Sequence, residues 1–385
     1  ENLKKKKTLT KCGLILSDRE RIELLKPLNS VSDINIGLLR AEFVFGSIGV
    51  HVKALKAYDY GIYDNVLELL KNNEIELKVN EFLKKSRFSD DEILFFEMLE
   101  FVISKQKNKT IKFLMNEKRV IYELISKNGF KNGHDFFVET IGDWLVSILH
   151  AFPNKEICYR ISDYKSNEYS GLIGGKIFEK EEANPILGFR GISRPIDKWE
   201  LETLVNVRSE KKSNNISLVL PFVRTEEDLA MAVYFLEQFG LKIGKNKLKI
   251  YSVIETPSSC IIMDKLAKYV DGFVIGSNDL TQGILMVDRD SCFLADFFDE
   301  ENPVVIQNIL TIIFSAVKCG KEVSFGGNAV SHSRLITAIV AIAGITSVNA
   351  TPDQYSRVKN DLYDIEKKNI RINKLGNWIN AYVYN

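Results

Sequence analysis

The sequence FVIGSNDLTQ at residues 273–282 follows VIETP at residues 253–257 by about one helix length. Each segment begins with a short run of β-forming residues and continues into a carboxylate, Glu255 in the first and Asp279 in the second. Neighbouring parallel strands end at the same edge of a sheet, so these two acids are expected to lie close together. Carboxylate oxygens suit Mg²⁺ or Mn²⁺. The two segments therefore predict adjacent strands with a metal site at their carboxyl ends.

Short β-forming runs recur along the chain with helical patterns between them, an alternation that is typical of a parallel sheet. Eight such runs are found, at residues 12–16, 34–39, 157–161, 216–221, 249–254, 272–275, 322–325 and 346–349. Eight strand–helix units in a chain of 385 residues predict an α/β fold, the (β/α)8 or TIM barrel.

One interval in this pattern, residues 40–156, is much longer than the others and has helical periodicity. The tetrapeptide SDDE at residues 89–92 is a capping-box pattern before an apolar periodic stretch, and residues 111–125 and 136–149 are also periodic. We therefore expect one barrel domain over residues 1–385, interrupted by a helical insertion at about residues 52–150. The insertion is either a structural elaboration or a lid or partner-binding element.

The composition argues against several classes of protein. The chain has 52 Lys and Arg against 51 Asp and Glu, a net charge of +1, so no overall field draws it to nucleic acid or to a membrane. It has no Walker A motif, no G-x-G-x-x-G motif and no basic aromatic platform for nucleic acid. No apolar run approaches the ~20 residues of a membrane span.

The cysteines and the N-terminal residues bear on the compartment. The five cysteines are scattered and form no C-x-x-C pair, so neither a disulfide framework nor a zinc site is expected. The lysine run at residues 4–7 is not followed by the apolar core of a signal peptide, and we expect a cytoplasmic location. The first residue is Glu1 rather than Met, and we expect the chain to be a piece of a longer polypeptide.

Charged or amide side chains lie at or just after the carboxyl ends of several predicted strands, and in a (β/α)8 barrel these ends carry the active site. These side chains are Arg40, Arg160, Arg224, Glu255, Asn278 and Asp279. Each of them alone could be an ordinary surface residue. Together they combine arginine forks, which suit carboxylate and phosphate, with hard oxygen ligands for a cation. The pattern predicts an anionic substrate bridged to a metal ion.

Further candidates lie in loops near these strand ends. Arg190 lies in NPILGFRGISR at residues 184–194, where glycines allow close backbone approach. It is either a fourth anion-binding arginine or a loop arginine paired with Glu179, Glu181 or Glu182. The pair Gly326-Gly327 ends the seventh strand and leaves room for a ligand.

The chain has four histidines, and their places in the predicted fold divide them into two pairs. His51 and His332 are close in sequence to the strand ends, so either could approach the site. His134 and His150 lie in the predicted insertion and are expected to be structural.

Together these segments resemble the C-terminal PEP/pyruvate-binding barrel of the PEP-utilising enzymes, and within that family the phosphoenolpyruvate synthases (pyruvate, water dikinases). The matching stretches run in family order and are IGLLRAEF (36–43), IGVH (48–51), RISDYKSNEY (160–169), NPILGFRG (184–191), PFVRT (221–225), IETPS (254–258), GSNDLTQ (276–282) and DRD (288–290).

The resemblance implies a transferase chemistry. In the family, a phosphohistidine on a swinging domain, charged by an ATP-grasp domain, passes its phosphoryl group to the enolate of pyruvate in the barrel. By resemblance Mg²⁺ (or Mn²⁺) would bind Glu255 and Asp279, and the catalytic residues would be Arg40, Arg160, Arg190 and Asn278. Substrate contacts would also involve Arg224, Ser277, Gly326, Gly327 and Asn328. The resemblance further implies a homodimer, with the phosphohistidine and ATP-grasp domains supplied in cis or in trans.

The chain departs from the family where the seventh strand ends. The family pattern Gly-x-Cys-Gly carries a cysteine that exchanges the methyl proton of pyruvate, whereas SFGG at residues 324–327 has Gly326 there, followed by Asn328 in place of Gln or Glu. Three readings stay open. One is a phosphotransferase that either uses Ser324, His332 or a water as the acid on pyruvate or phosphorylates another acceptor. The others are a non-catalytic module that senses PEP or pyruvate, and a lyase or aldolase.

Overall fold

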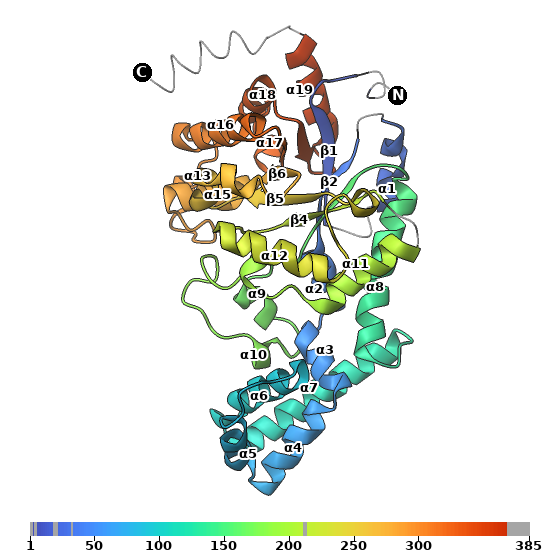
Figure 1. The fold of residues 1–385 in the computed structure, drawn as a ribbon, viewed down its shortest axis with the longest axis vertical. Coiled ribbons are helices and arrows are strands. Elements are labelled where there is room, and N and C mark those ends of the chain that lie inside the picture. The colour runs from blue at the N-terminus through green and yellow to red at the C-terminus, as the bar shows by residue number, and fades with distance from the viewer. Residues whose placement is uncertain (1–2, 4–5, 18–21, 32–33, 211–213, 368–385) are drawn as a thin grey trace.

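The computed structural model describes residues 3, 6–17, 22–31, 34–210 and 214–367. Its centre is a closed barrel whose strands pair in sequence order, each parallel to its neighbours, with β1 closing onto β8 (Figure 1). The strands are β1 Lys11–Leu16, β2 Ile36–Arg40, β3 Ile157–Arg160, β4 Ile216–Leu220, β5 Ile250–Ile254, β6 Gly272–Ile275, β7 Glu322–Phe325 and β8 Ser347–Ala350. The predicted (β/α)8 barrel is confirmed, and each predicted strand overlaps an observed one.

Most strand residues are apolar, many of them β-branched or aromatic, and such side chains can be buried on both faces of a strand. All residues of β4 (ISLVL) and β5 (IYSVI) are buried, as expected where helices cover the outside of a parallel barrel and side chains fill its interior. One interior cluster consists of Ile15, Leu38, Cys158, Val219, Tyr251, Val253 and Val274.

Helices and short 3-10 turns follow the strands around the barrel (Figure 1). The helices outside the long β2–β3 segment are α1 Ile22–Leu25, α9 Ser166–Ser170, α10 Gly175–Phe178, α11 Lys198–Glu210, α12 Glu226–Gln238, α13 Pro257–Ile261, α14 Met263–Leu266, α15 Ser277–Leu285, α16 Pro303–Lys318, α17 Ala329–His332, α18 Arg334–Ile342 and α19 Tyr355–Lys367. The 3-10 turns are Lys26–Ser30, Gly191–Ser193, Lys245–Lys247 and Ala295–Phe297.

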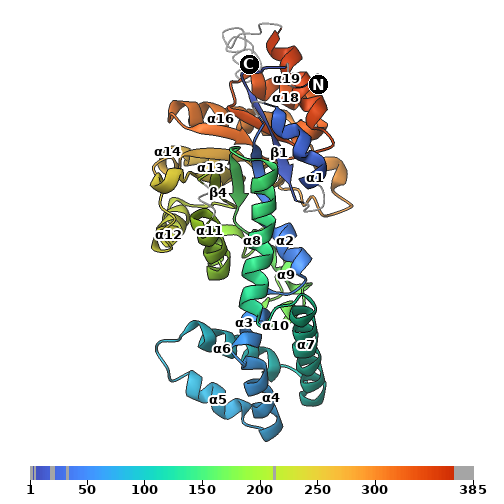
Figure 2. The ribbon, with the colours of Figure 1, turned by 90° about the vertical axis from the view of Figure 1, so that its right-hand side faces the viewer.

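The segment between β2 and β3 is helical, with α2 Ala41–Ile48, α3 Val52–Asp59, α4 Ile62–Asn72, α5 Ile75–Phe82, α6 Asp90–Ile103, α7 Lys107–Lys127 and α8 Gly133–Ala151. In Figure 1 helices α3 to α7 extend below the barrel, and residues 52–127 are called the helical lobe from here on. Helix α8 leaves the lobe and runs along the barrel, where it packs against α11 and α1 (Figure 2). At the start of α6, the Ser89 backbone N–H donates to Glu92 Oε2 at 3.1 Å, as the capping-box pattern predicts.

The lobe contacts the barrel through the loop that follows β3. Helix α10 in that loop packs against α3 and α6 of the lobe. The backbone N–H of His51 donates to the Ile173 carbonyl at 3.0 Å, and the Ile173 N–H donates to the Gly49 carbonyl at 3.0 Å. The start of the lobe is therefore joined to the βα3 loop, which also carries residues of the candidate site.

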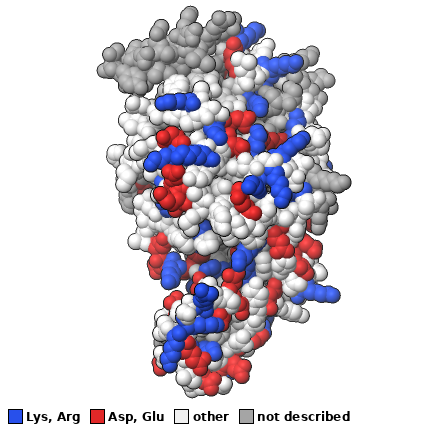
Figure 3. Space-filling model, in the orientation of Figure 1, with Lys and Arg blue, Asp and Glu red and all other residues white. Residues whose placement is uncertain are grey.

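The surface carries charges of both signs. On the face drawn in Figure 3, Lys and Arg alternate with Asp and Glu over both the barrel and the lobe, in agreement with the net charge of +1. Among the described residues, no helix combines the length and the apolar content that crossing a bilayer requires. All five cysteines are free thiols.

Candidate active site

The register of the strands brings the predicted site residues to one end of the barrel. Arg40 and Arg160 are direct partners at the ends of β2 and β3. Ile254 pairs with Ile275 at the ends of β5 and β6, so that Glu255 directly follows one strand while Asp279 lies in the first turn of α15 after the other. All four side chains thus come from the carboxyl ends of parallel strands, where the fold places active sites.

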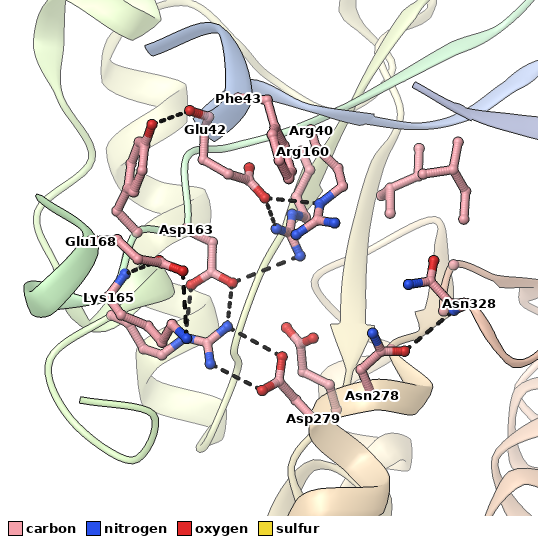
Figure 4. A pocket seen from close by; sticks show the side chains of 18 of the residues that line it. Arg40, Glu42, Phe43, Arg160, Asp163, Lys165, Glu168, Asn278, Asp279 and Asn328 are labelled. Carbon is pink, nitrogen blue, oxygen red and sulfur yellow. Dashed lines mark hydrogen bonds and ion pairs between the residues drawn. The ribbon is translucent and has the colours of Figure 1, made fainter. Parts of the chain in front are cut away.

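These side chains line a cavity of about 390 Å³ (Figure 4). The predicted residues that line it are Arg40, Arg160, Arg190, Glu255, Asn278, Asp279, Gly326, Gly327 and Asn328. The cavity also takes in charged side chains to which the sequence analysis assigned no role, namely Glu42, Asp163, Lys165, Glu168 and Arg289. All five lie inside the quoted stretches IGLLRAEF, RISDYKSNEY and DRD, so position within a motif was the signal that could have identified them.

Arg190 is clamped between two acids from different strand ends. Its Nε and Nη2 donate to the two oxygens of Asp163 at 3.0 and 2.6 Å, and its Nη1 and Nη2 donate to those of Asp279 at 3.0 and 3.2 Å. The guanidinium also lies 4.1 Å from the centre of the Phe222 ring, and Arg190 is only 3% exposed. Its bonds to both carboxylates fix the guanidinium at the wall of the cavity.

A second cluster joins the ends of β2 and β3, where the side chains drawn in Figure 4 converge. Glu42 Oε1 accepts hydrogen bonds from Arg160 Nη2 and, at 3.0 Å, from Arg40 Nε. Arg160 Nη1 lies 3.7 Å from Asp163 Oδ2, which links this cluster to Arg190. Within the described part of the chain, Glu42 Oε2 and Arg160 Nε are buried without a hydrogen-bond partner. This cluster therefore retains polar capacity that its own side chains do not use.

The charges around the cavity balance. Its cationic side chains are Arg40, Arg160, Lys165, Arg190 and Arg289, and its acidic ones are Glu42, Asp163, Glu168, Glu255 and Asp279. With five of each sign, the wall as a whole has no net charge when all are ionised. A multiply charged anion in this cavity would therefore need additional positive charge to offset the acids.

Two of these acids influence each other's protonation. Burial first, and then the charges of Asp279 and Asp163, raise the pKa of Glu255 to about 7 in spite of the nearby arginines. Burial acts in the same direction on Asp279, but Arg190 and Arg289 outweigh it and keep the pKa of Asp279 below its ordinary value. The repulsion between the two carboxylates is a cost that a cation between them would remove.

The residues at this place fit Mg²⁺. Glu255 Oε1 accepts a hydrogen bond from the Phe222 N–H at 2.7 Å, and Phe222 has a φ of 54°. Both oxygens of Asp279 accept hydrogen bonds from Arg190. A Cβ at Gly276 would lie 2.5 Å from Glu255 Oε2, so glycine is required beside that carboxylate. The described residues hold no cluster of three or more His, Cys, Asp or Glu side chains suited to a metal. Mg²⁺ is commonly bound by one or two carboxylates together with waters and substrate phosphates, which matches this pair.

Two of the predicted substrate-binding residues lie beside the cavity instead of lining it. Arg224 Nη2 donates to the Gly188 carbonyl at 2.6 Å and Nη1 donates to Ser193 Oγ, so the side chain holds the loop at 184–194. Ser277 Oγ donates to Glu300 Oε1 at 2.5 Å, and a Cβ at Gly327 would lie 2.0 Å from that Oγ. Arg224 and Ser277 therefore bond to residues that surround the cavity.

The space beside Gly326 is already filled. A Cβ at Gly326 would lie 2.5 Å from Val274 Cγ1 and 3.6 Å from Leu38 Cδ2. Ser324 lines a separate, small cavity among the amino ends of the strands, and His332 lines a shallow pocket beside Glu300. Neither residue is among the described residues that line the main cavity. The two side chains considered as substitute acids therefore lie outside the lining of that cavity.

Comparison with known proteins identifies the family of this chain. Residues 22–367 match the family model described as the PEP-binding domain of PEP-utilising enzymes. The phosphoenolpyruvate synthase of Pseudomonas aeruginosa is 39% identical over 267 residues, which cover 66% of this chain and 34% of that protein. That of Aquifex aeolicus is 30% identical over 348 residues, covering 88% and 40%. A probable phosphoenolpyruvate synthase of Staphylothermus marinus is 39% identical over 255 residues, covering 63% and 30%.

This chain thus spans between 30% and 40% of the length of these three relatives. The matched residues contain strands β2 to β8 and every residue that lines the cavity except Ile15, which lies in β1. The predicted resemblance is confirmed, and the chain belongs to the PEP-utilising enzyme family, in which it corresponds to the PEP-binding domain.

Proposed function

We propose that the cavity binds PEP or a related small anion together with Mg²⁺ and is the phosphoryl-transfer site of a PEP synthase-like phosphotransferase. The observation that carries this proposal is the gathering of four arginines and a lysine around Glu255 and Asp279 in one cavity at the carboxyl end of the barrel. Arginine forks match the oxygens of carboxylates and phosphates, and the acid pair suits a hard cation.

In this proposal Arg40 and Arg160, at adjacent strand ends, bind the phosphoryl and carboxylate oxygens of the ligand. Arg190 keeps Asp279 oriented through its two hydrogen bonds. Asn278 Oδ1 accepts from the Asn328 N–H at 3.3 Å, which leaves the Asn278 amide nitrogen to donate to the substrate. Mg²⁺ at Glu255 and Asp279 would supply the positive charge that the balanced wall lacks, where negative charge is spread over the transferred group.

The donor in this proposal is a phosphohistidine domain, charged by an ATP-grasp domain, in the same polypeptide or in a partner, with the barrel acting as a homodimer. Phosphoryl transfer needs little covalent chemistry from the barrel, because positioning and neutralisation of charge account for most of the catalysis. The relatives are phosphoenolpyruvate synthases of which this chain covers 30% to 40%, which leaves length for such domains.

The acceptor is the point at which a second candidate arises. Gly326 is surrounded by the apolar side chains Val274 and Leu38, so this wall offers no acid or base to the methyl carbon of pyruvate. An acceptor whose attacking oxygen needs no C–H proton removed fits this wall better than pyruvate. The same observation favours, as the second candidate, a module that binds PEP or pyruvate without turnover.

Titration calorimetry of the chain with PEP, with and without Mg²⁺, tests the binding proposal. We expect binding that depends on Mg²⁺ and is weakened by inorganic phosphate. If PEP does not bind in the presence of Mg²⁺, the proposal is wrong.

Incubation with pyruvate and Mg²⁺ in D2O separates the acceptors. We expect no exchange of the methyl protons, and measurable exchange would show that pyruvate chemistry is retained. Transfer of phosphate from a phosphohistidine partner domain to any acceptor would exclude the non-catalytic module.

A further inference from the structure

His51 lies where the chain passes from the barrel into the helical lobe. It is the N-cap of α3, its ring is buried at 2% exposure, and its Nδ1 accepts from the Lys53 backbone N–H at 3.1 Å. Because Nδ1 is an acceptor, the ring proton of the neutral imidazole is on Nε2. Nε2 lies 3.1 Å from Glu179 Oε1 and therefore donates to it.

Glu179 is shared between the lobe and the loop that carries Arg190. Its two carboxylate oxygens accept from Arg194 Nη1 at 2.8 Å and from Arg194 Nη2 at 2.6 Å. Arg194 Nε in turn donates to the carbonyl of Phe189 at 2.6 Å, the residue directly before Arg190. Three consecutive contacts thus run from the first cap of the lobe to the backbone beside the buried arginine of the cavity.

Further contacts, beside that of Arg194, restrain the backbone of the loop at 184–194. The Phe189 N–H donates to Glu182 Oε1 at 2.9 Å, and Arg224 binds the Gly188 carbonyl at 2.6 Å from the other side. Gly191 adopts φ +56°, and a Cβ there would lie 2.5 Å from Phe222 Cβ. Among Glu182, Arg194 and Arg224, which bond to the backbone of this loop, Arg194 is the one whose partner also bonds to His51 at the start of the lobe.

We propose that His51 is a positioning residue for Arg190: through Glu179 and Arg194 it sets the loop that places the guanidinium between Asp163 and Asp279. The helical lobe is thereby coupled to the anion site, although the residues that line the cavity come from the barrel and its loops. A shift of α3 relative to the barrel would pull on Glu179 and displace the backbone beside Arg190. The effect on ligand affinity rests on the proposed function, whereas the effect on the loop does not.

The first experiment measures the loop directly in the whole chain. The substitution His51→Asn keeps a side-chain acceptor for the Lys53 N–H, because Asn is a good N-cap, but removes the donor to Glu179. The matched control is His134→Asn, which removes another histidine–carboxylate contact, that of His134 Nε2 with Glu202 Oε2 at 3.0 Å.

We expect faster amide hydrogen exchange over residues 186–194 in His51→Asn, by roughly tenfold, and wild-type exchange there in His134→Asn. Equal protection of this loop in the wild type and in His51→Asn would overturn the proposal. Faster exchange throughout the barrel, with a large drop in melting temperature, would show a purely structural role and would overturn it as well.

The second experiment is a double-mutant cycle read out as the dissociation constant for PEP with Mg²⁺. We expect His51→Asn to weaken binding roughly tenfold, the size of one lost hydrogen bond to a charged group. In an Arg190→Ala background the same change should have no further effect, because His51 acts through Arg190. Additive losses would overturn the proposal.

The two readouts separate this proposal from the proposed function. If the wild type fails to bind PEP, the proposed function fails, and hydrogen exchange still decides whether His51 positions the loop.

Discussion

The two sides of the cavity differ in their chemistry. On the side formed by the ends of β2 and β3, arginines and acids are joined in a continuous network that includes Arg40, Glu42, Arg160 and Asp163. On the side formed by the end of β7, the lining residues are Gly326, Gly327 and Asn328, and Val274 fills the space beside Gly326. The first side is suited to holding an anion, and among the described residues the second presents no titratable side chain to the cavity.

In the proposed function, this difference assigns anion binding and proton transfer to separate sides of the cavity. The charged side depends on many mutually supporting contacts, so losing one member leaves another buried and unpaired, which is costly. The β7 side depends on the packing of Gly326 against Val274, which takes no part in the charged network.

The largest effect is expected for Asp279→Asn on the charged side. This change removes an anion that bonds to Arg190 and serves as a proposed metal ligand, so PEP affinity with Mg²⁺ should fall by about 100-fold or more. The control is Asp290→Asn, which removes a half-exposed acid bonded to Lys165 near the same cavity. Calorimetry measures the affinity of each variant for PEP. Equal affinities in the two variants would contradict the role of Asp279.

The pH dependence of the free energy of unfolding tests the buried carboxyl of Glu200, which bonds to residues on both sides of Arg160. Glu200 accepts from the Ser162 N–H at 3.0 Å and from Tyr159 Oη at 2.9 Å, and burial raises its pKa to about 7. Between the ordinary pKa of 4.5 and this raised value, the folded state keeps a proton on Glu200 that the unfolded state has lost. The free energy of unfolding therefore falls as pH rises from about 4.5 to about 7, and above pH 7 the full cost of ionising the buried carboxyl is present.

Glu200→Gln should remove this penalty. We expect the wild type to lose up to about 3 kcal/mol relative to the variant between pH 4.5 and pH 8. Denaturant unfolding across this pH range measures the difference, and parallel curves for the two proteins would refute the assignment.

The β7 side can be tested by attempting to introduce the missing thiol. Gly326→Cys places a Cβ 2.5 Å from Val274 Cγ1, and this overpacking should destabilise the fold by about 2 kcal/mol. The double variant Gly326→Cys with Val274→Ala should recover much of that loss and is the form in which methyl exchange of pyruvate in D2O could arise. Thermal unfolding gives the first readout, and full stability of the single variant would show that the space is not filled.

The smallest effect is expected for Arg289→Gln at the mouth of the cavity. Arg289 Nη2 lies 3.6 Å from Asp279 Oδ1, and its side chain is 24% exposed, so solvent screens its charge. PEP affinity should fall about threefold at low salt, and the difference should shrink at 0.5 M salt. A loss as large as that of Asp279→Asn would mean that Arg289 binds the ligand directly.

Much of the barrel could be predicted from local patterns in the sequence. The eight strands were identified because each is a short apolar run bounded by turn residues, and a parallel strand buried on both faces leaves such a run in the sequence. Arg160 ends its strand and Glu255 directly follows its strand, so both are predicted at the carboxyl ends of the strands, and the structure places both at the cavity. The ion pairing between Arg190 and Asp279 could not be predicted, because these residues are far apart in the chain and meet only through the closed barrel.

By itself, the sequence determined the strand positions, the end of the barrel at which the charges gather and the presence of a long helical segment after β2. Only the tertiary structure decided that Arg224 turns to the 184–194 loop, that Val274 fills the place beside Gly326, and that His51 bonds to Glu179. The physical reason is that strands follow from the polarity of neighbouring residues, whereas the direction of a side chain and its partner depend on packing between segments distant in the sequence.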